Sequence, residues 1–143
     1  MIEIRDAKSE DVSAVYALGE HVDEFHTSDQ APTFWPKAML GACVGKDDVY
    51  FLVAISGKEI VGFIIVNLNK NLRKALIENI FVKPGFRKRG IGLNLTKKVI
   101  ERAKSDQYQF ISVLTPPDDI AAINTYQRAG FSKGETFLWL DVA

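Results

Sequence analysis

Hydrophobic and polar residues follow two different periods along this chain, and the change from one to the other predicts its elements. Runs that alternate with period two, or are continuously apolar, are typical of strands. They occupy residues 2–5, 50–55, 60–67, 76–82, 109–114, 131–132 and 136–142. Apolar residues spaced three or four apart are typical of helices. They occupy residues 9–22, 36–45, 90–104 and 118–130.

Residues with special backbone preferences mark the ends of these elements. Ser9 is expected to cap the first helix, with Glu10 and Asp11 favourable in its first turn. The Ser56-Gly57-Lys58-Glu59 run predicts a hairpin between two strands. Gly130 suits the left-handed conformation that ends many helices, so the last helix is expected to stop there.

Composition fits one globular domain spanning residues 1–143. Of the 143 residues, 47% are hydrophobic, and a chain of this size buries roughly 70% of its unfolded surface. Cys43 is the only cysteine, which excludes an internal disulfide and indicates a reducing, cytoplasmic location. The first residues alternate like a strand and do not form a signal peptide, and no apolar run reaches transmembrane length.

Charge is balanced in total, with 18 basic and 18 acidic side chains, but it is unevenly distributed. A net charge of zero gives no reason to expect a nucleic-acid or membrane partner. Residues 70–104 hold eleven basic residues and only two acids, Glu78 and Glu101. Residues 9–36 hold no Lys or Arg and six acids: Glu10, Asp11, Glu20, Asp23, Glu24 and Asp29.

The stretch from Leu76 to Ala103 joins a strand, a basic glycine turn and a helix in that order. Pro84 and Gly85 end the strand, because Pro has no N–H to donate and Gly accepts positive φ. The Arg87-Lys88-Arg89-Gly90-Ile91-Gly92 segment follows, and the first N–H groups of the next helix have no partner within that helix. Glycines let a phosphate approach these groups closely, so the turn predicts an anion site.

This turn does not fit the common nucleotide-binding motifs. It lacks the G-x-x-x-x-G-K-[ST] run of a P-loop and the third glycine of a Rossmann turn. It resembles instead the R/Q-x-x-G-x-G/A motif of GCN5-related N-acetyltransferases, whose preceding strand is similar to Ile80-Phe81-Val82 followed by Pro84. Residues 122–131, AINTYQRAGF, also resemble the A-x-x-x-Y-x-x-x-G-F helix end of that family.

The resemblance covers residues 76–131 and implies a fold, an activity and a cosubstrate. The fold would be the α/β acyl-coenzyme A N-acyltransferase fold, a mixed and mostly antiparallel sheet with helices on both faces, splayed between the fourth and fifth strands. The activity would be acetyl transfer from acetyl-coenzyme A to an amine. The residues expected to hold the coenzyme are Ile80, Phe81, Val82, Arg87, Lys88, Arg89, Gly90, Ile91 and Gly92.

The resemblance also implies a base and an acid. Glu78 is the only acid on the strand before the turn, where some members carry a catalytic Glu, and the run from Leu76 to Val82 is similar to that of spermidine/spermine acetyltransferases. Tyr126 matches the family's general-acid tyrosine, since a phenol stays protonated at pH 7 and can donate to a thiolate. The alternatives are a solvent-facing Glu on a strand and an aromatic ring filling the core.

Two positions depart from the family pattern. Asp119 stands where the family usually has an Asn that contacts the coenzyme, and an acid is less favourable there, so Asp119 is left out of the expected site. Leu114 stands where ribosomal-protein alanine acetyltransferases have a Glu. That difference disfavours a protein N-terminus as the acceptor.

The acidic segment indicates the class of acceptor. In the family, the first helix and the loop after it form one wall of the acceptor cleft, and an acidic wall attracts cations. We therefore expect a cationic small amine or a basic peptide as partner, with candidate substrate-binding residues Glu24, Phe25, His26 and Trp35. A protein N-terminal or lysine acetyltransferase and a coenzyme-binding regulatory module without turnover remain alternatives, and a homodimer is left open.

Two further features predict no additional site. The basic run at Arg87 is short and lacks interleaved aromatic residues, which disfavours nucleic-acid binding. His21 and His26 are five residues apart and share no helical face, so no metal site is expected.

Overall fold

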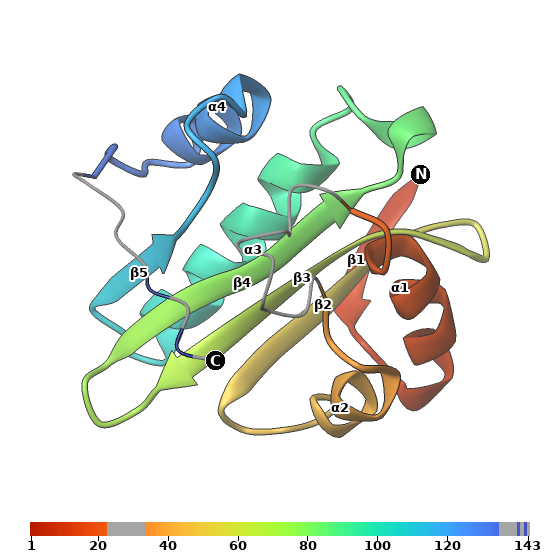
Figure 1. The fold of residues 1–143 in the computed structure, drawn as a ribbon, viewed down its shortest axis with the longest axis horizontal. Helices are drawn as coiled ribbons and strands as arrows, with labels where there is room; N and C mark the ends of the chain where they lie inside the picture. Colours follow the sequence, from red (N-terminus) through yellow and green to blue (C-terminus); the bar gives the residue numbers. More distant parts are fainter. Residues whose placement is uncertain (23–33, 135–139, 141, 143) are drawn as a thin grey trace.

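The computed structural model describes residues 1–22, 34–134, 140 and 142, and these form a five-stranded sheet with helices on both faces (Figure 1). The strands are β1 (Ile2–Asp6), β2 (Val49–Ser56), β3 (Glu59–Asn69), β4 (Lys74–Val82) and β5 (Phe110–Val113). The helices are η1 (Ser9–Asp11), α1 (Val12–Gly19), α2 (Lys37–Ala42), η3 (Pro84–Phe86), α3 (Ile91–Ser105) and α4 (Ile120–Arg128).

The sheet has the strand order β1-β2-β3-β4-β5, and its last pair differs from the others. The first three pairs are antiparallel, whereas β4 and β5 are parallel. β5 pairs only with the first half of β4, from Lys74 to Ile77. Beyond Ile77 the second half of β4 is paired with β3 alone among the described strands, which confirms the predicted mixed sheet with its opening between the fourth and fifth strands.

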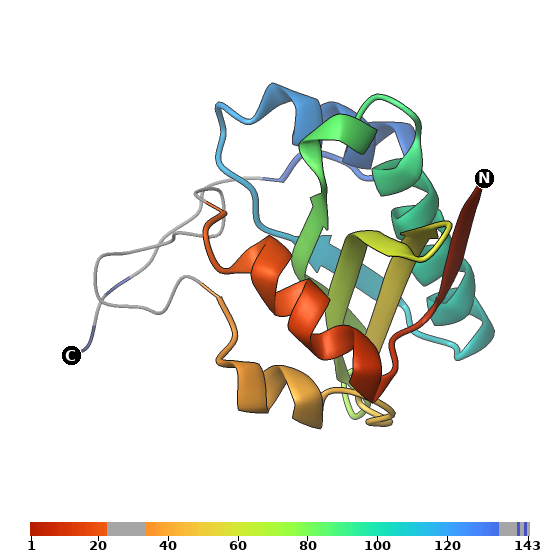
Figure 2. The same ribbon diagram turned by 90° about the vertical axis from the view of Figure 1, so that its right-hand side faces the viewer.

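The helices complete one hydrophobic core on each face of the sheet (Figure 2). α3 covers one face with buried residues spaced four apart: Ile91, Leu95, Val99 and Ala103. α1 and α2 cover the other face with Val15 and Leu40. Because side chains alternate along a strand, Phe63 of β3 packs toward α1 and α2 while the next residue, Ile64, packs toward α3.

A bulge interrupts β4 at the point where β5 ends. Ile65 of β3 is opposite Asn79, and Val66 is opposite Ile77, so Glu78 is an extra residue with no partner on β3. Ile77 and Ile80 both belong to the α3 core, so Glu78 and Asn79 are the two residues between them. A bulge of this kind redirects side chains locally and increases the strand twist.

Most of the predicted elements are confirmed, and two local predictions are wrong. Ser9 does not cap the first helix, because the N-cap of η1 is Lys8, whose backbone N–H donates to the Asp11 carboxylate at 2.8 Å. Residues 131–132 are not a strand. Phe131 instead closes α4, with its N–H donating to the Tyr126 carbonyl at 3.0 Å. The strand expected at residues 136–142 lies almost wholly outside the described residues.

Candidate active site

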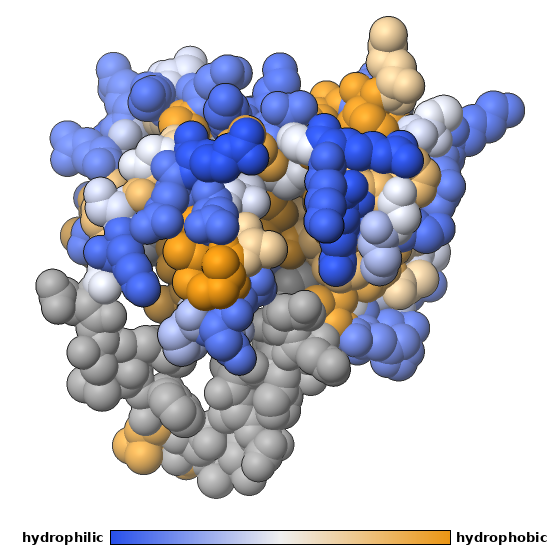
Figure 3. Space-filling view, turned by 90° about the horizontal axis from the view of Figure 1, so that it is seen from above, coloured by the Kyte–Doolittle hydropathy of each residue, from blue (hydrophilic) through white to orange (hydrophobic). Residues whose placement is uncertain are grey.

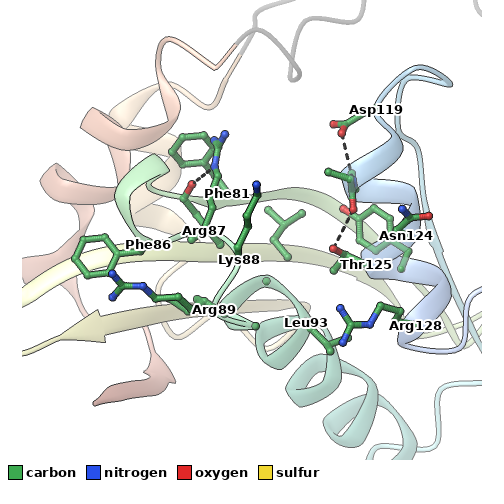
Figure 4. Close-up of a pocket in the computed structure, with 18 of the residues that line it drawn as sticks. Phe81, Phe86, Arg87, Lys88, Arg89, Leu93, Asp119, Asn124, Thr125 and Arg128 are labelled. Carbon is green, nitrogen blue, oxygen red and sulfur yellow. Dashed lines mark hydrogen bonds between the residues drawn. The ribbon is translucent and has the colours of Figure 1, made fainter.

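A cavity of about 860 Å³ lies between the second half of β4, the glycine turn that starts α3, and α4. Figure 4 shows these three walls, with side chains from each directed at the space between them. Seen from above, this end of the molecule has apolar surface in its middle and hydrophilic side chains around it (Figure 3). All nine residues expected to hold the coenzyme, Ile80 to Val82 and Arg87 to Gly92, line this cavity.

The backbone of β4 is open toward the cavity. The Lys83 N–H donates to the Val61 carbonyl on β3 at 2.8 Å. Because N–H and C=O groups point to alternate sides along a strand, those of Ile80 and Val82 point away from β3, to the side that β5 leaves open. An extended ligand with amide groups can pair with such an edge as an added strand would.

The glycine turn starts α3 in a conformation suited to anion binding. Gly90 is the N-cap of α3 with φ of 80°, in the left-handed region where glycine has no steric penalty. Its carbonyl accepts from the Asn94 N–H at 2.9 Å, which leaves the N–H groups before Asn94 without helical partners. A Cβ at Gly92 would lie 3.8 Å from Val82, an ordinary contact, so the protein itself does not require glycine there.

The three consecutive basic side chains of the turn point in different directions (Figure 4). Arg87 lies 5.0 Å from the Phe81 ring and donates from Nε to the Val82 carbonyl at 2.8 Å. Arg89 lies 5.1 Å from the Phe86 ring. Lys88 extends into the gap between the turn and α4, and Arg128 reaches from α4 toward the start of α3. Neither Lys88 nor Arg128 forms an ion pair with any residue that the structure describes.

Tyr126 lies on the α3 side of the sheet and lines the cavity. It is 7% exposed, and its ring packs against Phe131 with centroids 5.6 Å apart. Burial raises the pKa of the phenol, and the negative charge of Asp119 raises it further. The phenol therefore stays protonated across the neutral range and is able to donate a proton.

Asp119, which was not expected in the site, lines the cavity. It is the N-cap of α4, and its Oδ1 accepts from the Ala122 N–H at 3.2 Å. The acid is tolerated because capping a helix N-terminus favours a carboxylate. Asp119 therefore has a structural place at the cavity, because it starts the helix that carries Tyr126.

Glu78 and Trp35 lie outside the cavity lining, on the opposite side of β4. Glu78 is exposed, and its Oε1 accepts a hydrogen bond from Nδ2 of Asn67 at 2.9 Å. Trp35 donates from Nε1 to Oδ1 of Asn79 at 2.7 Å. Trp35 thus contacts the residue of β4 that directly follows Glu78. Glu24, Phe25 and His26 lie outside the described residues.

Several residues of the cavity were not identified from the sequence: Val22, Phe86, Leu93, Ala121, Ala122, Asn124, Thr125 and Arg128. The α4 members had a usable signal, since positions 119, 122 and 126 share one face of a helix. The described residues contain no group of three His, Cys, Asp or Glu side chains able to hold a metal ion. They also contain no helix long and apolar enough to cross a membrane.

Comparison with known proteins gives one family. Residues 15–131 match the family model described as "Acetyltransferase (GNAT) family". A curated relative, "Uncharacterized N-acetyltransferase MJ1207" of Methanocaldococcus jannaschii, is 37% identical over 94 residues, which is 62% of this chain. The chain spans only 41% of the length of that relative.

Solved structures share the fold. The ribosomal-protein-S18-alanine N-acetyltransferase of Escherichia coli superimposes with a TM-score of 0.75 at 18% identity, over 94% of this chain and 80% of the other. AAC(6')-Iy, in complex with the bisubstrate analog CoA-S-monomethyl-acetylneamine, superimposes with a TM-score of 0.79 at 18% identity. The superposition covers 100% of this chain and 99% of the other. At this identity the likeness concerns the fold alone.

Proposed function

The chain belongs to the acetyltransferase (GNAT) family of acetyl-coenzyme A-dependent N-acetyltransferases, and on that premise we propose that it acetylates a primary amine by direct attack on the thioester. The observation that supports this most is the meeting, in one cavity, of an open strand edge, a basic glycine turn and a buried tyrosine. These are the parts that a thioester donor with a pyrophosphate requires.

The proposed coenzyme site uses the three walls differently. The N–H groups at the start of α3, with Lys88 and Arg128 on either side, would bind phosphates. The open N–H and C=O groups of Ile80 and Val82 would pair with the amides of the pantetheine arm. The Val82 carbonyl already accepts from Arg87, so that arginine would share or release this carbonyl on binding.

We assign the general acid to Tyr126. As the amine attacks, the thiolate that leaves requires a proton, and a thiol has a pKa of about 8.5. The phenol of Tyr126 lines the cavity and remains protonated, because burial raises its pKa. Donation to sulfur lowers the barrier only in the step where the negative charge develops.

We assign the general base to Glu78. An alkyl ammonium with a pKa of about 10.4 requires roughly 4.6 kcal/mol to lose its proton at pH 7, and a carboxylate acting through a water can supply part of this. Glu78 lies on the α1–α2 side of β4, where the strand edge opens. Acid and base would therefore approach the reacting carbonyl from opposite faces of the sheet.

We propose a cationic acceptor, and fewer acidic residues support this proposal than the sequence suggested. Asp11 is buried and forms a bidentate ion pair with Arg5, at 2.7 and 3.2 Å, so it contributes nothing to an acidic wall. Arg5 accordingly lowers the pKa of Asp11. Glu20 follows α1, two residues before Val22 of the cavity lining. Asp23, Glu24 and Asp29, the acids that follow Glu20 in the sequence, lie outside the described residues.

The test is a panel of amines with detection of free coenzyme A. We expect spermidine, neamine and a Lys-rich peptide to give a higher kcat/KM than glutamate, and the advantage to shrink at high salt because salt screens charge. A preference for glutamate would contradict the cationic acceptor. Tight binding of acetyl-coenzyme A without turnover of any amine would identify a coenzyme-binding module instead of an enzyme.

A further inference from the structure

Glu78 accepts a hydrogen bond from the neighbouring strand β3, and we propose that the donor, Asn67, is a positioning residue for the base. Nδ2 of Asn67 donates to Oε1 of Glu78 at 2.9 Å. The inference rests on the base role proposed above for Glu78. It gives a function to a residue that belongs to none of the sequence motifs.

The register of the sheet explains how the pair forms. Asn67 lies opposite Leu76, two residues before Glu78. By alternation along β3, Asn67 shares a face with Phe63 and Ile65, which pack toward α1 and α2. Along β4, Ala75 and Ile77 pack toward α3, so alternation puts Leu76 and Glu78 on the face of Asn67. The contact therefore follows from the register of β3 with β4 before the bulge, and the extra residue brings Asn79, which lies opposite Ile65, to that same face.

The next residue of β4 is held in a comparable way. Asn79 follows Glu78 directly, and its Oδ1 accepts from Nε1 of Trp35 at 2.7 Å. Trp35 packs against the core formed by α1 and α2. The two successive polar residues of the bulge therefore both have partners on that face, one from β3 and one from the segment before α2. Hydrogen bonds from other elements therefore hold the side chains of Glu78 and Asn79 in place.

An amide is a suitable partner for a carboxylate that acts as a base. The Asn67 hydrogen bond occupies one oxygen of Glu78 and restricts its side-chain rotation, while Oε2 stays available to accept a proton. Within the described chain Glu78 forms no ion pair, so no cation competes with the incoming ammonium for the carboxylate. Asn67 orients the charge of Glu78 and leaves it uncompensated.

The experiment is a double-mutant cycle on kcat, with the best acceptor among spermidine, neamine and the Lys-rich peptide. Asn67→Leu keeps the branched shape of the side chain and removes the donor, and it should lower kcat roughly tenfold, as expected for a lost hydrogen bond to a charged group. In the Glu78→Gln background the same change should lower kcat less than about twofold, because Asn67 acts through Glu78. Asn67→Asp, which puts a second carboxylate beside Glu78, should be at least as harmful as Asn67→Leu.

Asn69 provides the matched control, since it lies on the same face of β3 two residues away. Its Oδ1 accepts from the Leu72 N–H at 3.1 Å in the turn, so Asn69→Ala should change thermal stability but not kcat. An equal loss of kcat from Asn67→Leu in both backgrounds would show a structural role and overturn the inference. If Glu78→Gln is slow while Asn67→Leu matches the parent enzyme, only this inference fails. If Glu78→Gln has the parent kcat at all pH values, the proposed base role itself fails.

Discussion

The cavity beside the glycine turn has a smaller counterpart of about 300 Å³ at the other end of β4 and α3. Both hollows are lined by cationic side chains. At the smaller one the charges have protein partners: Lys70 pairs with Asp47 at 2.7 Å, and Arg73 donates to the Gln107 carbonyl at 2.7 Å. At the larger one, Lys88 and Arg128 have no acidic partner among the described residues.

The difference distinguishes two uses of charge. At the smaller hollow, cations satisfy backbone carbonyls and acids of neighbouring loops, and so hold the sheet edge to the end of α3. At the larger hollow, cations converge on open space next to the unpaired N–H groups of a helix start. Charge that a fold leaves unpaired beside a cavity is available to an anionic ligand. Matched substitutions at the larger and the smaller hollow test this contrast.

The largest effect is expected from Gly92→Glu. The added carboxylate would project into the cavity and repel phosphates, so binding of acetyl-coenzyme A should weaken at least about a hundredfold, or roughly 2.7 kcal/mol. Stability should be unchanged or higher, since Glu is a better helix former than Gly and suits a helix N-terminus. Calorimetric titration and thermal unfolding measure both. Gly41→Glu is the control, because Gly41 is also helical and open but lies in α2. Equal binding of acetyl-coenzyme A by both variants would show that the glycine turn is not part of the coenzyme site.

The next effect separates two buried tyrosines. Tyr126→Phe should lower kcat by about a hundredfold, a typical contribution of an acid catalyst, with unchanged affinity for acetyl-coenzyme A. Tyr50, whose hydroxyl donates to Asp106 at the other end, is the control. Tyr50→Phe should keep the parent kcat and lower the free energy of unfolding by about 1 kcal/mol. Full activity of the Tyr126 variant would mean that the phenol is only a packing residue.

A smaller effect is expected from the cations. Arg128→Ala should weaken coenzyme binding about tenfold, through the loss of one charge-assisted contact with phosphate. The ratio of the variant's Kd to the parent's Kd should fall as salt is raised, because salt screens the contact between Arg128 and phosphate in the parent. Lys70→Ala should bind the coenzyme like the parent at every salt concentration. If both variants lose affinity alike, the ligand senses only the total charge of the molecule.

The smallest expected effect concerns stability at alkaline pH, and it should be alike for Tyr126 at the larger hollow and Tyr50 near the smaller one. Burial raises the pKa of both Tyr126 and Tyr50, and for Tyr50 the hydrogen bond to Asp106 adds to the shift. Each tyrosine thus stabilises the folded state fully below pH 10, where the unfolded residue begins to ionise, and less as pH rises further. Each Phe variant should reduce the alkaline fall in stability by up to about 1.4 kcal/mol per pH unit. Denaturant unfolding between pH 9 and 11 measures it, and an unchanged slope would contradict the raised pKa values.

Local sequence patterns were enough to predict the parts of the site that depend on backbone conformation. Gly130 adopts the positive φ predicted for it, whereas Gly85, for which positive φ was also considered, lies inside η3 without it. Tyr126 is buried on α4 and packs against Phe131, the last residue of the motif that indicated it. Such features depend on neighbours within one or two turns, which a sequence displays directly.

Features that depend on distant contacts could not be predicted in the same way. The three basic residues of the turn have the same chemistry, but the rings of Phe81 and Phe86 draw Arg87 and Arg89 aside and leave Lys88 in the gap. Asp11 lies at a helix start as predicted, but the sequence did not predict its buried ion pair with Arg5 of β1. The contact between Asn67 and Glu78 depends on the register of β3 with β4, which no single-strand pattern specifies.

The bulge in β4 also has a consequence for protein engineering. Removal of Glu78 by deletion would restore strict alternation, with Ala75, Ile77, Ile80 and Val82 on the α3 face and Asn79 and Phe81 on the other. All four of the former already pack in one core, so the shortened strand should fold without exchanging a single buried side chain. Glu78 behaves as an insertion within a regular strand, and we expect a chain lacking it to fold and to bind the coenzyme while lacking the proposed base.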